Sequence, residues 1–169
     1  MDLDNKIKSI HNLLHNKKFN QAKQELEKLI KKFPKNSYLL NLIGLTYQYL
    51  NDYNSSINFF ISALKNDEKN IAAMNNLANS YKKQLNFFEA EKIYKKVINI
   101  DPDYVHALNN FANLKIEIND YESAISLLER AILISNKRNI KSSEIMITLA
   151  KVYQSINNLE KVKEILNHE

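Results

Sequence analysis

The sequence predicts an all-α protein, built as a solenoid of antiparallel helix pairs. Two observations carry this prediction: the same residue classes recur at a spacing of 34 residues, and within each unit the apolar residues form two stripes with the spacing of amphipathic helices. The composition agrees, because one Gly and two Pro in 169 residues leave few points at which a helix must break.

Each 34-residue unit is expected to form two helices joined by a short turn. With the register set at residues 37, 71 and 105, positions 4, 7, 8 and 11 of the units are mostly apolar, and so are positions 17, 20, 24 and 27. Positions 8, 20 and 27 are mostly small, which lets the two helices approach closely. They are filled by Gly44, Ser56 and Ala63, then by Ala78, Ala90 and Val97, then by Ala112, Ala124 and Ala131.

The outer units follow the same register less strictly. Residues 3–36 match well in their second half, whereas Ser9 and Ile10 make the first helix the poorest match. After residue 138 four residues (NIKS) are inserted, and the register resumes at residue 143. Pro34 and Pro102 mark two of the unit boundaries, because proline cannot continue the preceding helix.

The stretches LIGLTYQYLNDYNSSINFFISAL and NLANSYKKQLNFFEAEKIYKKVINIDP resemble the tetratricopeptide repeat (TPR) family. The resemblance covers essentially the whole chain and implies a right-handed superhelical solenoid in a single domain. It implies about five repeats, at residues 3–36, 37–70, 71–104, 105–138 and 143–169. For function it implies a scaffold that binds other proteins, since this fold serves many partners.

A row of Asn residues forms the candidate binding surface. At about 100° per residue, Met74, Leu77, Ala78 and Tyr81 share one sector of their helix, and the neighbouring Asn side chains lie roughly 160° away. The family resemblance implies that positions 2, 5, 6 and 9 line a concave groove that faces the ligand. With Lys83, the predicted groove residues are Asn41, Asn75, Asn76, Asn79, His106, Asn109, Asn110 and Asn113.

Two interpretations of these Asn residues remain open at this stage. Asn is unfavourable in a helix by about 0.6 kcal/mol relative to Ala, so a repeated cluster is costly unless its amides hold a ligand such as an extended peptide backbone. The NNLAN phrase resembles the repeats of O-linked N-acetylglucosamine transferase, where an Asn ladder holds substrate polypeptide. Alternatively, the whole chain is rich in Asn, as the genes of an AT-rich genome would be.

Other site chemistries find little support in the sequence. The chain has no Cys and a single Gly, which removes thiol chemistry, Cys-based zinc sites and phosphate-binding Gly loops. His11 and His15 could share one helix face, but no third metal ligand is evident. A clamp for a C-terminal carboxylate would have only Lys83 and Lys151 as cations. We therefore expect no catalytic residues, no metal and no cofactor.

Charge and hydropathy favour a cytoplasmic protein that binds proteins, with no nucleic acid and no membrane as partners. The net charge of +5 arises from residues 1–36, where nine Lys face four acidic residues, a pattern typical of a solvated end face. No apolar run approaches the roughly 18 residues of a membrane span.

The last unit suggests a possible assembly edge, because a solenoid needs a polar cap and the final helix is apolar on one side. Its candidate residues are Leu159, Val162, Ile165 and Leu166. Two interpretations stay open. The chain is the N-terminal part of a longer protein, such as the recruitment domain of a glycosyl- or sulfotransferase, or this edge pairs with a second copy and makes a homo-oligomer.

Overall fold

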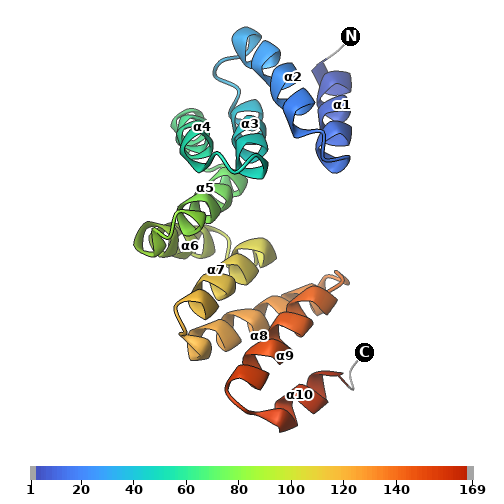
Figure 1. Ribbon diagram of the computed structural model, residues 1–169, viewed down its shortest axis with the longest axis vertical. Helices are drawn as coiled ribbons and strands as arrows, with labels where there is room; N and C mark the ends of the chain where they lie inside the picture. The colour runs from blue at the N-terminus through green and yellow to red at the C-terminus, as the bar shows by residue number, and fades with distance from the viewer. Residues whose placement is uncertain (1–2, 167–169) are drawn as a thin grey trace. The chain divides into compact units, whose positions relative to one another are not determined.

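In a computed structural model of the protein, which describes residues 3–166, ten α-helices and no strands are found within the described range (Figure 1). The all-α fold class predicted from the sequence is confirmed. The helices are α1 Leu3–His15, α2 Phe19–Lys32, α3 Ser37–Tyr49, α4 Tyr53–Asn66, α5 Ile71–Lys83, α6 Phe87–Ile100, α7 Val105–Glu117, α8 Tyr121–Lys137, α9 Ser143–Ser155 and α10 Leu159–Leu166.

The helix starts follow the sequence repeat. The first helices of the first four pairs begin at residues 3, 37, 71 and 105, and the second helices at 19, 53, 87 and 121, a spacing of 34 residues in each series. The fifth pair begins at residues 143 and 159, after the inserted residues. The second helix of the preceding pair, α8, has 17 residues, whereas the equivalent helix α4 has 14. The chain after the fourth repeat therefore has both a longer helix and an added loop.

Polar side chains set the start of six of the described helices. The capping residues each accept a hydrogen bond from the backbone N–H three residues later, and they are Asn36 (3.0 Å), Asp52 (3.0 Å), Asn70 (2.9 Å), Asn86 (3.4 Å), Asp120 (3.3 Å) and Asn158 (3.2 Å). A cap of this kind satisfies one of the backbone donors that a helix leaves unpaired at its start. Part of the Asn content of the chain therefore stabilises the fold.

A left-handed residue ends the first helix of each pair. Lys17, Asn51, Leu85, Asn119 and Asn157 all have φ between 57° and 61°. Asn tolerates this conformation better than other non-Gly residues, because its short side chain can hydrogen-bond locally. Leu85, which is 72% exposed, has neither this advantage nor buried contacts to offset the strain.

The chain divides into two compact units, which we call the N-terminal unit (up to Ile93) and the C-terminal unit (from Tyr94). In the N-terminal unit α3 packs against both α2 and α4. Its main apolar cluster contains Ile10, Ala22, Leu26, Leu29, Leu39, Leu42 and Ile43. The buried small residues Gly44, Ser56 and Ala63 allow α3 and α4 to pack closely. These residues occupy positions 8, 20 and 27 of the repeat, where small side chains were predicted to allow close packing.

In the C-terminal unit α7, α8 and α9 enclose a second apolar cluster, centred on Leu108, Leu128, Leu149 and Tyr153. The Tyr153 hydroxyl donates to Glu129 at 2.9 Å, and burial together with this carboxylate raises the pKa of Tyr153 to about 12. Among the described residues, none of the helices is both long enough and apolar enough to cross a bilayer.

Candidate functional site

The predicted Asn row of the N-terminal unit lies on α3 and α5. The side-chain Nδ2 of Asn76 on α5 donates to Oδ1 of Asn41 on α3 at 3.1 Å. Both side chains are half-buried. The structure therefore joins two predicted groove residues that are 35 residues apart in the sequence.

This hydrogen bond leaves complementary groups on the pair. It uses one N–H of Asn76 and the carbonyl oxygen of Asn41, and no partner within the described residues is seen for Oδ1 of Asn76 or Nδ2 of Asn41. The pair thus retains one acceptor and one donor. The backbone N–H and C=O of one residue in an extended segment point the same way, so one donor and one acceptor can bind them with two hydrogen bonds.

The other predicted residues of α5 are less available. Asn75 is only 5% exposed, and both Asn75 and Asn79 already interact with other groups in the protein. Lys83 is exposed at the last position of α5. Asn76 is therefore the α5 residue best placed to receive a ligand together with Asn41.

A buried polar network behind Asn76 was not predicted. Gln48 Nε2 on α3 donates to Ser80 Oγ at 2.9 Å and to the backbone carbonyl of Asn76 at 3.3 Å. Ser80 Oγ also lies 2.8 Å from Ser56 Oγ on α4. These contacts fix α3, α4 and α5 around the Asn41–Asn76 pair. One sequence signal pointed to them: Ser56 replaces the Ala found at position 20 in the next two units.

In the C-terminal unit the predicted residues lie on α7 and differ in their surroundings. Asn113 Nδ2 donates to the backbone carbonyl of Asn109 at 2.9 Å, so this amide bonds to its own helix. His106 is exposed and meets Tyr104 edge-on, with ring centroids 5.6 Å apart. Asn110 is half-buried and already interacts with another group.

Asn109 also lines a pocket of about 400 Å³ between the start of α7, the end of α8 and the start of α9. Two of the residues that line it, Asn109 and Ser135, each have a side-chain oxygen that is buried and has no hydrogen-bond partner, namely Oδ1 of Asn109 and Oγ of Ser135. His106 and Asn109 were predicted as groove residues, whereas Ser135 and the inserted loop were not predicted to contribute to a site. The four-residue insertion before residue 143 was the available signal.

The residues of the predicted assembly edge differ in their exposure. Val162 and Ile165 pack against the apolar cluster of their own unit, whereas Leu159 is 56% exposed. The side chain of Leu166 lies outside the described part of the chain.

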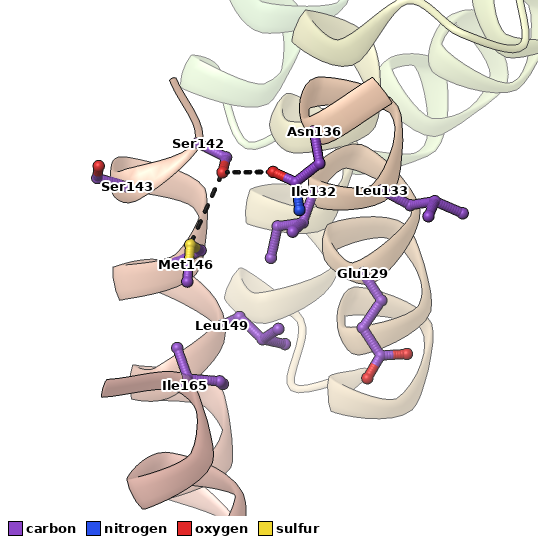
Figure 2. Close-up of a pocket in the computed structure, with 9 residues that line it drawn as sticks. All are labelled: Glu129, Ile132, Leu133, Asn136, Ser142, Ser143, Met146, Leu149 and Ile165. Carbon is purple, nitrogen blue, oxygen red and sulfur yellow. Dashed lines mark hydrogen bonds between the residues drawn. The ribbon is translucent and has the colours of Figure 1, made fainter. Parts of the chain in front are cut away.

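A second pocket of about 840 Å³ opens beside Ile165, between α8, α9 and α10 (Figure 2). Figure 2 shows Ser142 at its rim, hydrogen-bonded to Asn136 at 3.4 Å and to the sulfur of Met146 at 3.7 Å. Leu133, on the α8 side of the pocket, is 55% exposed.

The residues considered for metal or carboxylate binding do not assemble such a site. His11 Nε2 lies 2.6 Å from the hydroxyl of Tyr38, which occupies that ring nitrogen. Within residues 3–166 no group of three His, Cys, Asp or Glu side chains comes together to hold a metal ion. Lys83 and Lys151 are both exposed, and they belong to different units.

Family comparisons agree with the repeat architecture. Residues 12–36, 37–70 and 70–137 each match a family described as tetratricopeptide repeat. The chain is 24% identical over 163 residues to N-terminal acetyltransferase A complex auxiliary subunit NAA15 from Arabidopsis thaliana, an alignment that covers 96% of this chain and 18% of that protein. The chain spans 18% and 36% of the length of the two curated relatives that it matches.

Solved structures show the same fold. The Pseudomonas aeruginosa pilF structure superposes with a TM-score of 0.83 at 16% identity, covering 97% of this chain and 73% of that one. A thermophilic TPR protein from Thermus thermophilus gives 0.82 at 15% identity, covering 96% and 87%. At these identities the likeness concerns the fold alone.

Proposed function

This chain belongs to the tetratricopeptide repeat proteins, and we propose that it is a non-catalytic scaffold that holds an extended polypeptide segment through its Asn amides. Proteins with this fold typically bind other proteins. In this chain, the Asn side chains would bind the backbone of the polypeptide.

The Asn41–Asn76 pair is the observation that carries the proposal. Its hydrogen bond orients the two amides, and the remaining acceptor on Asn76 and donor on Asn41 match the backbone N–H and C=O of one residue in an extended segment. The network of Gln48 and Ser80 holds the backbone behind the pair, so little side-chain freedom is lost when a peptide binds. Recognition through backbone groups would tolerate many peptide sequences.

Several other Asn residues of the chain have structural roles that Asn41 and Asn76 lack. Asn36 and Asn70 cap helices, and Asn51, Asn119 and Asn157 occupy left-handed turns, so these residues have a stabilising role in the fold. Asn41 and Asn76 have neither role, since both lie inside helices where Asn is unfavourable. A ligand-binding role would account for their retention.

The Arabidopsis relative is an auxiliary subunit of an acetyltransferase complex, which supports a recruiting role beside a catalytic partner. By analogy, this chain would bring a polypeptide to an enzyme without itself reacting. A chain that recruits polypeptides in this way could also be the recruitment domain of a larger transferase.

A capture experiment with matched variants tests the proposal. The chain with Asn76→Ala and Asn110→Ala should lose most of the polypeptides that the unaltered chain captures from a native extract. A captured segment made as a synthetic peptide should bind the variant directly with an affinity at least about tenfold lower than its affinity for the unaltered chain. Asn58→Ala with Asn99→Ala is the control, because both residues are exposed on second helices, one in each unit. Equal capture and equal affinity for all three proteins would refute the proposal.

A second candidate function is self-assembly through the α8, α9 and α10 edge. The open pocket of about 840 Å³, together with the exposed Leu133 and Leu159, favours it. Multi-angle light scattering would show a dimer whose dissociation is promoted by Leu133→Lys with Leu159→Lys. A monomer at all concentrations up to the millimolar range would exclude this function.

A further inference from the structure

The turn between α5 and α6 carries the two most exposed large apolar side chains among the described residues. Leu85 is 72% exposed and Phe88 is 77% exposed. In the other four repeats the same two positions are polar or charged. Position 15 of the repeat holds Lys17, Asn51, Asn119 and Asn157, and position 18 holds Asn20, Asn54, Glu122 and Glu160. The apolar pair is therefore specific to the third repeat, and the fold does not require it.

Leu85 occupies this position in an unfavourable backbone conformation. Its φ of 61° lies in the left-handed region, which Asn tolerates better than Leu. Hydrogen bonds hold the turn in place, because Asn86 N donates to the carbonyl of Tyr81 at 3.0 Å and Gln84 Nε2 donates to Oδ1 of Asn54 at 2.7 Å. A turn that presents two bulky apolar side chains to solvent is typical of a contact surface, since a partner would bury them.

The pocket between α8, α9 and α10 offers a complementary surface in the C-terminal unit. Its volume is about 840 Å³, and pockets of roughly 300–1,000 Å³ hold ligands larger than one side chain. The pocket therefore has room for a Leu and a Phe side chain together. Its apolar lining residues, labelled in Figure 2, are Ile132, Leu133, Met146, Leu149 and Ile165.

The charges of the two surfaces are opposite. Among the described residues that line the pocket, the one charged side chain is that of Glu129, whose Oε1 accepts a hydrogen bond from Tyr153. On α6, Lys92 follows Phe88 by four residues and so neighbours it on the helix surface. The Lys92 side chain is 70% exposed, and its contact with Glu89, at 3.9 Å on the surface, is a weak one. A Lys beside the apolar pair thus matches a Glu in the apolar pocket.

We propose that the α5–α6 turn of one copy of the chain, with Leu85 and Phe88 as anchors, binds in the pocket between α8, α9 and α10 of a second copy. Bulky side chains that enter a pocket carry much of the energy of a protein interface. Two copies associate through one such contact, or through two if a twofold axis relates them. This inference rests on the self-assembly given above as the second candidate function, and it names what fills the pocket.

Two variants, each lacking one of the two surfaces, test the contact. The turn variant has Leu85→Asn with Phe88→Glu, which reproduces the fourth repeat and should fold at least as stably, since Asn suits the left-handed turn and Glu suits a helix start. The pocket variant has Leu133→Lys with Met146→Gln. By sedimentation equilibrium, each variant alone should have a dissociation constant at least about tenfold higher than that of the unaltered chain. The control Ile118→Gln, at another exposed apolar residue, should leave the constant unchanged.

A mixture of the two variants provides a further measurement, because the intact turn of the pocket variant can still bind the intact pocket of the turn variant. The mixture should form heterodimers at concentrations at which each variant alone is monomeric. The absence of Cys allows the contact to be located by cross-linking. A short bismaleimide should join a Lys92→Cys chain to an Asn136→Cys chain, at the rim of the pocket, more efficiently than to a Ser126→Cys chain, at an exposed residue of α8 outside the pocket.

The outcomes separate this inference from self-assembly in general. If the turn variant assembles as tightly as the unaltered chain, while Leu133→Lys with Leu159→Lys still promotes dissociation, the edge assembles but the turn does not fill the pocket. A monomer at all concentrations would reject both proposals. A mixture that stays monomeric would also overturn the contact. Binding of a monomeric chain to vesicles of phosphatidylserine and phosphatidylcholine, lost in the turn variant, would assign the turn to a lipid surface and overturn the inference.

Discussion

A Cβ atom on Gly44 would lie 2.6 Å from Cε1 of the Phe60 ring. Gly44 is on α3 and Phe60 is on α4, and the Phe60 side chain is completely buried. The single Gly of the chain is thus the residue that lets an aromatic ring fill the space between these helices.

We expect Gly44→Ala to lower the free energy of unfolding by about 1–3 kcal/mol, because the added methyl group meets a ring with no room to move. Urea denaturation followed by circular dichroism would measure the loss. In a Phe60→Leu background the same change should be neutral or stabilising, since Ala is the better helix former and the Ala112 and Leu128 pair already fills these repeat positions in the C-terminal unit. Equal effects in both backgrounds would contradict the steric explanation.

Leu85→Asn should stabilise the protein by about 0.5–1 kcal/mol, because Asn tolerates the left-handed conformation that Leu85 adopts with φ 61°. Asn51 and Asn119 occupy the same repeat position in the same conformation. Lys96→Asn, at an exposed residue in the interior of α6, should instead be destabilising because Asn is a poorer helix former than Lys. Thermal unfolding of the two variants should therefore shift in opposite directions.

Asp120→Asn should weaken the dependence of stability on pH. Hydrogen bonds from Ser123 and from Lys115 hold the pKa of the Asp120 carboxyl below its ordinary value. A lowered folded-state pKa contributes stability above the unfolded value of about 3.9, and that contribution is lost as the pH falls through the lower folded value. The unaltered chain should be the more stable protein at pH 7, and the two should converge towards pH 2. A difference that is constant with pH would show that the charge has no role.

Asn41→Ala with Asn76→Ala should change the free energy of unfolding by less than about 1 kcal/mol. One hydrogen bond worth about 1 kcal/mol is lost, while helix propensity improves at two positions by about 0.6 kcal/mol each. The same double variant should lose peptide binding. Parallel urea denaturation and binding titrations would separate the two effects, and a large loss of stability would show that the pair mainly supports the fold.

Much of the fold could be predicted from the sequence, because the repeat depends on the spacing of residues that are close together in the chain. The 34-residue offset, the small residues at Gly44, Ala78 and Ala112, and the apolar stripes each predicted a feature that the helices confirm. The division into two compact units and the longer α8 were not predicted, since both depend on how neighbouring pairs pack.

The candidate site was only partly predictable. Sequence position placed Asn75 and Asn76 together as groove residues, yet Asn75 is buried and already bonded while Asn76 pairs with Asn41. Ser135 gave no signal, because a Ser inside a helix looks ordinary until its hydroxyl is found buried and unpaired.

By itself the sequence determined the helix pairs, their register and the positions that need small side chains, since these follow from the turn of the α-helix and from residues a few positions apart. Only the tertiary structure decided which of these amides already have partners within the protein and that residues of the NIKS insertion line a pocket. The physical reason is that a hydrogen bond is satisfied by whichever group lies within reach, and that group often comes from another helix. Asn41 and Asn76, 35 residues apart, form a hydrogen-bonded pair only when α3 and α5 come together.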